Sequence, residues 1–183
     1  MARISIENLS KTYPNGVKAL DNVNLEIENG MFGLLGPNGA GKSSLMRTLA
    51  TLQEADSGSA FLDDIDILNQ PREVRKTLGY LPQEFGVYAR VTAEQLLDHI
   101  AILKGIDKKS ERKELVNYLL QKVNLYDKRS KSVKGFSGGM KQRVGIAQAL
   151  IGSPKLIIVD EPTAGLDPGE RNRFHNLLAD VGD

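Results

Sequence analysis

The chain contains no cysteine and carries almost no net charge. The absence of cysteine among 183 residues excludes disulfides, zinc sites with thiolate ligands and cysteine nucleophiles, and it fits a reducing cytosol. The chain has 24 basic and 23 acidic side chains, so its formal net charge is +1. No overall electrostatic field therefore favours binding to nucleic acid or to an anionic membrane. We therefore expect no nucleic-acid partner, and we expect any charged ligand to be bound by a local cluster.

Long hydrophobic runs are also missing. No apolar stretch approaches the ~20 residues that a membrane-spanning helix needs, and residues 1–16 lack the apolar core of a signal peptide. If the protein serves a membrane, another chain does the crossing. With 40% hydrophobic and 26% charged residues, the composition is that of a globular domain with one sizeable core.

The first eighty residues follow a strand, loop and helix pattern. Apolar and polar residues alternate on both sides of a turn at "YPNG", which predicts two strands within the first thirty residues. Residues 31–36 ("MFGLLG") form a short apolar run typical of a buried strand, and residues 42–52 continue as a helix. We further expect a hairpin in "SGSAFLDDIDI" and a short strand in "TLGYLP".

Helices dominate between Val91 and Ile151. Thr92 and Gln95 have the spacing of a capping box at the first helix. Three apolar stripes at helical spacing follow, and we expect them to pack in a core: Leu96, Ile100 and Leu103; Leu115, Leu119 and Val123; Met140, Val144, Ala147 and Ile151. Strand character returns at "KLIIVD", and residues 168–182 form an amphipathic pattern with Pro168 at its start.

One glycine-rich loop predicts a phosphate site. Residues 36–43 ("GPNGAGKS") match the P-loop pattern, in which backbone N–H groups surround a phosphate at the start of a helix. Lys42 can neutralise the β- and γ-phosphates, and the hydroxyl of Ser43 can bind Mg²⁺. The residues expected to bind nucleotide here are Gly36, Pro37, Asn38, Gly39, Ala40, Gly41, Lys42, Ser43 and Ser44.

A pair of acidic residues narrows the chemistry. Asp160 and Glu161 follow the apolar strand "LIIV", so one carboxylate can reach the Mg²⁺ shell while the next orients and deprotonates water. An acidic pair after a strand is also common at ordinary turns. Together with the P-loop, it predicts a nucleoside triphosphatase with water as the acceptor.

A second helix start is suited to an anion. Ser137 occupies an N-cap position and is followed by Gly138 and Gly139, which leaves N–H groups and a hydroxyl at a helix N-terminus. The simpler alternative is that Ser137 only caps its own helix. Since the P-loop phosphates already have Lys42, Ser43 and the loop amides, a second set of donors makes sense if it faces the γ-phosphate on another subunit.

These motifs together resemble the nucleotide-binding domain of ATP-binding cassette (ABC) transporters, and the likeness runs from end to end. "GPNGAGKS" corresponds to Walker A, "LIIVDE" to Walker B, and "SGGMKQR" to the signature that closes over ATP on the opposite subunit, with Ser137, Gly138, Gly139 and Gln142 as its contacts. The resemblance further implies that Tyr13 stacks on adenine. It implies that Gln83 is the Q-loop glutamine and Asp167 the D-loop residue.

The resemblance also implies a fold and a set of ligands. We expect an α/β P-loop NTPase (RecA-like) core with an N-terminal antiparallel β-subdomain, residues 1–83 and 152–183, and an inserted helical subdomain, residues 84–151, within one domain spanning 1–183. ATP and Mg²⁺ are the implied cofactors. The implied metal ligands are Ser43, Gln83 and Asp160, and the implied catalytic residues are Lys42, Gln83 and Glu161.

The implied partners are a second nucleotide-binding domain, either identical or a paralogue, and a transmembrane permease subunit. The implied location is cytoplasmic, peripheral on the inner face of the cell membrane. The segment from Tyr80 to Ile106 most resembles ATPase subunits of multidrug or antibiotic exporters.

Two positions depart from the family pattern. Phe136 stands where leucine is usual, and we expect it to pack under the loop all the same. The family's switch histidine lies at the end of the strand that follows the helix after the D-loop, and the chain ends at Asp183 before any such strand. The histidines of this chain, His99 and His175, lie too early in the sequence to replace it. We therefore expect the last core strands to be missing and the domain to be C-terminally truncated.

Two alternatives stay open at this point. A soluble ABC protein acting on ribosomes or DNA is one, although such proteins usually have two cassettes or a long coiled-coil insertion. The other is a nucleotide-binding fragment without efficient turnover.

Overall fold

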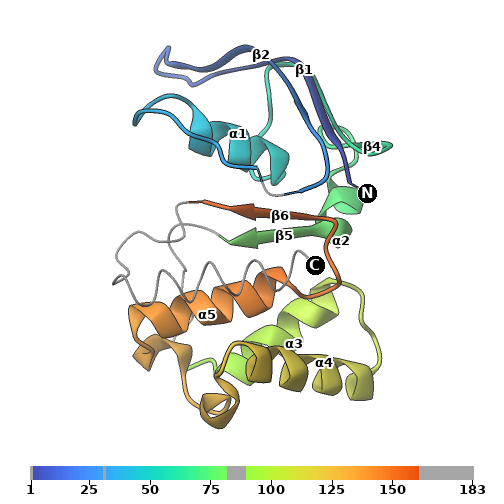
Figure 1. Ribbon diagram of the computed structural model, residues 1–183, viewed down its shortest axis with the longest axis vertical. Helices are drawn as coiled ribbons and strands as arrows, with labels where there is room; N and C mark the ends of the chain where they lie inside the picture. Colours follow the sequence, from blue (N-terminus) through green and yellow to red (C-terminus); the bar gives the residue numbers. More distant parts are fainter. Residues whose placement is uncertain (1, 31, 82–89, 161–183) are drawn as a thin grey trace. The chain divides into compact units, whose positions relative to one another are not determined.

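The computed structural model describes residues 2–30, 32–81 and 90–160. The chain divides into two compact units, Met1–Leu78 and Gly79–Asp183. Figure 1 shows the elements of each unit along the chain.

The first unit contains a four-stranded antiparallel sheet. Its strands are β1 (Ile4–Thr12), β2 (Lys18–Ile27), β3 (Ser57–Leu62) and β4 (Ile65–Asp66), in the order β2-β1-β3-β4. Alternate residues of β1 (Ile4 and Ile6) and of β3 (Ala60 and Leu62) are buried, as predicted, and in β1 the alternation shifts by one residue before the buried Leu9, where the strand register is irregular. The two N-terminal strands and the hairpin of β3 and β4 are thereby confirmed.

Two helices accompany this sheet in the first unit. The predicted helix after the P-loop is α1 (Lys42–Leu49), which buries Leu45, Thr48 and Leu49. A further helix, α2 (Pro71–Thr77), has Pro71 in its first turn and Val74 as its one buried residue. The sequence did not predict α2, because seven residues with a single buried side chain show no measurable helical period.

The buried strand predicted over 31–36 is wrong for the residues that the structure describes. Residues 32–36 form no strand, and the side chains of Phe32 and Leu35 are 52% and 96% exposed. The apolar run has strand composition, but a strand also needs a neighbour to pair its N–H and C=O groups. No strand in the described part of the chain pairs with this segment.

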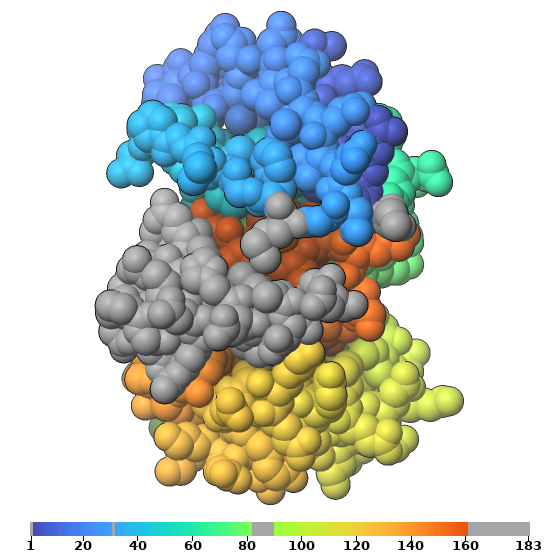
Figure 2. All heavy atoms as spheres, viewed as in Figure 1, coloured from blue at the N-terminus to red at the C-terminus, as the bar shows by residue number. Residues whose placement is uncertain are grey.

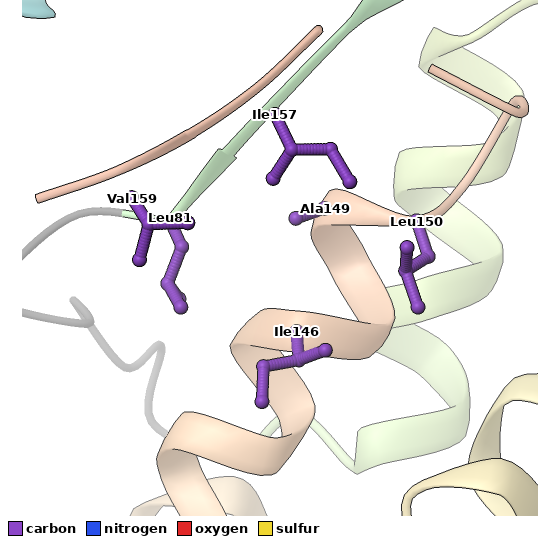
Figure 3. Close-up of a pocket in the computed structure, with 6 residues that line it drawn as sticks. All are labelled: Leu81, Ile146, Ala149, Leu150, Ile157 and Val159. Atoms are coloured by element: carbon purple, nitrogen blue, oxygen red, sulfur yellow. The ribbon is translucent and has the colours of Figure 1, made fainter. Parts of the chain in front are cut away.

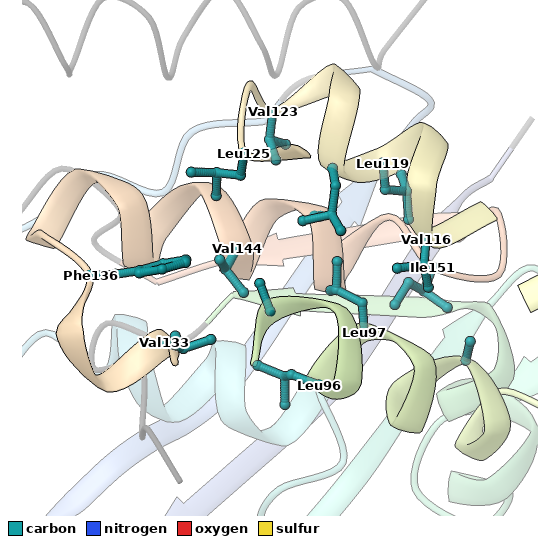
Figure 4. Packing of buried hydrophobic residues seen from close by; sticks show 14 residues of the cluster. Leu96, Leu97, Val116, Leu119, Val123, Leu125, Val133, Phe136, Val144 and Ile151 are labelled. Atoms are coloured by element: carbon teal, nitrogen blue, oxygen red, sulfur yellow. The ribbon is translucent and has the colours of Figure 1, made fainter. Parts of the chain in front are cut away.

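Within residues 90–160, the second unit contains three helices, α3 (Ala93–Leu103), α4 (Lys109–Lys122) and α5 (Gly138–Ala149), and two short 3-10 helices, η1 (Tyr126–Lys128) and η2 (Val133–Gly135). Figure 4 shows side chains of the three helices and their connections converging in one apolar core. The capping box of Thr92 and Gln95 is present in both directions. Phe136 is 6% exposed and lies in this core, as expected.

One member of the predicted stripes lies outside the core. Leu103 is 69% exposed, whereas the rest of its stripe is buried or packed against the core. Leu103 is the last residue of α3, and the chain turns immediately afterwards at Gly105, which has φ +84°. Helical spacing places a residue on a face, but the last turn of a helix need not have a neighbour to pack against.

A two-stranded sheet of β5 (Leu78–Leu81) and β6 (Leu156–Val159) completes the described part of the second unit. Figure 3 shows side chains of these strands directed toward Ile146 and Ala149 of α5 and toward Leu150, which follows the helix. Gly79 allows β5 to lie this close, because a Cβ there would collide with the carbonyl oxygen of Ala149. Both strands were predicted, whereas the helix predicted over 168–182 lies outside the described residues.

Among the described helices, none is both long enough and apolar enough to cross a bilayer.

Candidate functional site

The P-loop is an exposed connection that leads directly into α1. Residues 36–40 are exposed, and Figure 2 shows this part of the first unit at the surface, drawn in light blue. Gly39 and Gly41 both have φ +85°, a backbone conformation that glycine adopts without strain. Gly41 is the N-cap of α1, and no side chain caps the helix. No side chain thus competes with an anion for the start of α1, and the helix dipole favours negative charge there.

Gly41 is also required by packing. A Cβ at this position would lie closer than 3.0 Å to the carbonyl oxygen of Ala19 in β2. The loop is thus pressed against the sheet at the point where the helix begins. In contrast, a Cβ at Gly39 would meet no atom within 4 Å.

Lys42 lies over its own loop. Its Nζ donates hydrogen bonds to the carbonyl oxygens of Gly36, at 2.6 Å, and Pro37, at 2.8 Å. Phosphate oxygens are stronger acceptors for an ammonium group than neutral carbonyls are. The contacts therefore hold the ammonium beside the loop amides, where a polyphosphate would recruit it.

The side chain of Tyr13 contacts the first turn of α1, close to Lys42 in the sequence. Its hydroxyl lies 3.0 Å from Ser44 Oγ and donates to Gln53 Oε1 at 3.0 Å. Gln53 Nε2 in turn donates to the carbonyl oxygen of Ser44 and to Thr48 Oγ1, both at 2.9 Å. Tyr13 and Ser44, both predicted to bind nucleotide, are thus brought together, and Gln53 is a residue that sequence reasoning missed.

The strand end that carries Tyr13 is fixed by a carboxylate as well. Asp56 accepts from Lys11 Nζ at 2.9 Å and from the backbone N–H of Thr12 at 2.6 Å. These hydrogen bonds, the one from Lys11 foremost, lower the pKa of the Asp56 carboxyl below its ordinary value of 3.8. No local pattern announces either Gln53 or Asp56, because their partners lie 40 and 44 residues earlier in the chain.

In the second unit, Asp160 directly follows β6. It is 2% exposed, and its backbone N–H donates to the carbonyl oxygen of Leu81 at 3.0 Å, which extends the pairing of β5 and β6 by one residue. The predicted residues Gln83, Glu161 and Asp167 lie outside the described residues. Of the predicted acidic pair, the structure therefore describes only Asp160.

The signature segment begins α5. Ser137 is the N-cap, and its Oγ accepts from the backbone N–H of Met140 at 3.3 Å. The expectation that its hydroxyl is left free is therefore wrong for the oxygen, because the serine caps its own helix. That bond uses only a lone pair, so the hydroxyl hydrogen can still be donated.

The two glycines of the signature differ in their surroundings. Gly139 is buried, whereas Gly138 is exposed, and a Cβ built on Gly138 would meet nothing within 4 Å. Nothing in the described part of the chain therefore requires glycine at position 138. Gln142, in the next turn, is partly buried.

The P-loop, the signature segment and the strand end at Asp160 are found together in known proteins that resemble this chain. The family described as "ABC transporter" matches residues 20–164. The ABC transporter ATP-binding protein YxlF of Bacillus subtilis, itself described as uncharacterized, is 40% identical over 179 residues. The doxorubicin resistance ATP-binding protein DrrA of Mycobacterium tuberculosis is 36% identical over 178 residues.

These alignments cover 97% and 96% of the chain, but only 58% and 54% of the two relatives. The chain thus spans little more than half the length of the curated relatives it matches. Among solved structures, the ATP-binding cassette MJ0796 bound to ADP and Pi superposes with a TM-score of 0.88 at 29% identity. That match covers 98% of the chain and 83% of the cassette.

The structural match confirms the predicted α/β P-loop NTPase fold with its N-terminal antiparallel β-subdomain. The family match includes the P-loop, the signature and Asp160 within a single alignment. The chain belongs to the ABC transporter family.

Proposed function

We propose that the protein is the ATP-binding and ATP-hydrolysing subunit of a transporter, working as one of two cassettes beside a membrane-embedded permease. The observation that carries the proposal is the start of α1, where two glycines at φ +85°, a helix without a side-chain cap and the ammonium of Lys42 converge. That combination fits a polyphosphate, because it offers several N–H donors and one mobile positive charge. Its relatives are named as ATP-binding proteins.

We assign a separate task to each residue that the sequence predicts to act on ATP. The loop amides hold the β- and γ-phosphates, and Lys42 exchanges its two carbonyl acceptors for phosphate oxygens. Ser43, Asp160 and Gln83 are the residues proposed to hold Mg²⁺, which would neutralise charge that develops on the phosphates. Glu161 orients water and accepts its proton.

Domain boundaries follow from the same proposal. Residues 1–183 form one nucleotide-binding domain, with 1–83 and 152–183 as core and β-subdomain. Residues 84–151 are the helical subdomain, which meets the permease. The protein then works in the cytoplasm, on the inner face of the membrane.

The second cassette is needed because the signature serves a neighbour. Gly138 is open on the side where a Cβ would point, and Asp167 belongs to the same proposed interface. MJ0796 cassettes have been solved as dimers. Relatives include DrrA and the methionine import protein MetN of Corynebacterium diphtheriae, whose names refer to different compounds. In this proposal the permease, and not this chain, contacts the transported substrate.

Two variants test the catalytic assignment. Lys42→Ala should abolish ATP binding, measured by calorimetry, because it removes the one mobile cation of the loop. Glu161→Gln should bind ATP, hydrolyse it at least about a hundredfold more slowly, and accumulate as an ATP-bound dimer in size-exclusion chromatography. Unchanged hydrolysis in Glu161→Gln would contradict its role as general base.

A glycine pair tests the signature. Gly138→Ala should leave the thermal unfolding temperature equal or slightly higher, because alanine gains up to about 1 kcal/mol over glycine within a helix. ATP-dependent dimerisation in the Glu161→Gln background should nevertheless weaken, since the added methyl lies where the partner's phosphate would approach. Gly135→Ala, at an equally open glycine outside the signature, is the matched control. Equal dimerisation in both variants would argue against the composite site.

A further inference from the structure

The side chain of Tyr13 is held by a directed chain of hydrogen bonds that ends on the helix of the P-loop. Gln53 is the centre of this chain. Its amide orientation follows from its neighbours: the carbonyl oxygen of Ser44 can only accept, so the group facing it, at 2.9 Å, must be Nε2. Oε1 therefore faces Tyr13.

This orientation also fixes the direction of the remaining bonds. Because Tyr13 has a single hydroxyl hydrogen and donates it to Gln53 Oε1, Ser44 must be the donor in the 3.0 Å contact between its Oγ and the tyrosine hydroxyl. Thr48, which is 1% exposed, donates to the carbonyl oxygen of Ser44 at 2.9 Å and accepts from Gln53 Nε2. Every member of the chain is thus used in one consistent sense.

Three more hydrogen bonds limit the movement of the backbone at Tyr13. The backbone N–H of Tyr13 donates to Val17 and its carbonyl accepts from Gly16, both at 2.9 Å, so the turn between β1 and β2 is closed around it. The adjacent Thr12 is bonded to Asp56. With the backbone and the hydroxyl both fixed, little freedom is left to the torsion angles that orient the ring.

We propose that Gln53 is a positioning residue for nucleoside recognition: by bridging Tyr13 to Ser44 and Thr48 it holds the aromatic ring ready for the base, independently of how the P-loop binds phosphates. This inference rests on the proposed function, because it takes the ligand to be a nucleoside triphosphate whose base stacks on Tyr13. It predicts that Gln53 contributes to the affinity for ATP and contributes nothing to the affinity for the triphosphate group alone.

Comparison of two ligands separates these contributions. Inorganic tripolyphosphate contacts the loop amides and Lys42 but has no base, whereas ATP has both parts. Binding of each to the wild-type protein and to Gln53→Ala, Tyr13→Phe and the double variant is measured by calorimetry with Mg²⁺ present. Gln121→Ala, at an exposed glutamine of α4, is the matched control.

Gln53→Ala should weaken ATP binding about three- to tenfold, the effect of losing one or two hydrogen bonds. Tripolyphosphate binding should stay within about twofold, which also shows that the P-loop is still folded in each variant. Tyr13→Phe keeps the ring and removes only the hydroxyl, so it should show the same selective loss. The double variant should be no weaker than either single one, because all three break the same bridge.

Equal weakening of both ligands by Gln53→Ala, or no weakening of ATP, would overturn the role of Gln53 while leaving the proposed function intact. Additive losses in the double variant would overturn it too. If the wild-type protein bound neither ligand, the proposed function itself would fall and the inference with it.

Discussion

The close contact between Gly41 and strand β2 can be tested by adding a single methyl group at position 41. In Gly41→Ala, the new Cβ would lie closer than 3.0 Å to the carbonyl oxygen of Ala19. The residue would also have to keep φ near +85°, a region that costs alanine about 1–2 kcal/mol. Relief of the collision must displace the backbone of either β2 or the loop, which adds about 1–3 kcal/mol.

We therefore expect Gly41→Ala to lower the free energy of unfolding by about 2–5 kcal/mol. Gly39 provides the control, because it has the same φ of +85° and open space around a Cβ. Gly39→Ala should cost only the conformational part, about 1–2 kcal/mol.

The measurement is thermal unfolding followed by circular dichroism without nucleotide. For a chain of this size, each kcal/mol corresponds to about 2–4 °C, so the two variants should differ by several degrees. Equal unfolding temperatures would refute the close contact between Gly41 and β2. A larger loss in Gly39→Ala would refute the ranking of the two effects.

The remaining predictions concern the helical core and the end of β1. Phe136→Ala should lower the free energy of unfolding by about 3–5 kcal/mol, because a buried ring leaves a cavity, whereas Phe136→Leu should cost only about 1–2 kcal/mol; equal losses in chemical denaturation would contradict this packing. Asp56 has a folded-state pKa below its ordinary 3.8, so its stabilising contribution is present above that value and is lost as the pH falls toward the folded pKa. Asp56→Asn should accordingly unfold more easily than the wild type at neutral pH, and the difference should shrink as the pH falls below 3.8 toward the folded pKa. A difference that persists in acid would show that charge on Asp56 is not its cause.

What the sequence predicts well in this chain is what depends on near neighbours. Thr92 and Gln95 are three residues apart, and their reciprocal capping bonds are present as expected. The segment 32–36 shows the opposite case, because its composition is local but its pairing is not. Leu103 has helical spacing from Leu96 and Ile100, which lie in or against the core, but it is the last residue of α3 and its side chain is exposed.

The same reasoning explains the outcome at the candidate site. The P-loop could be recognised because its glycines, lysine and serine perform one task within eight consecutive residues. Gln53 could not, because a glutamine in a loop has no local signature and its partner Tyr13 lies 40 residues away. Only folding of β1 against the segment after α1 gives that side chain a role.

The two helix starts that looked alike in the sequence are unequal in the structure, and the inequality bears on their tasks. At α1 the N-cap is a glycine, and no side chain caps the helix. At α5 the N-cap is Ser137, which already uses the amide of Met140. The first helix can therefore hold an anion with several donors and Lys42, while the second contributes fewer. A helix start with so few donors fits a role of completing a site whose phosphates are already bound elsewhere. It follows that changes at the signature should alter dimerisation far more than the affinity of one cassette for ATP.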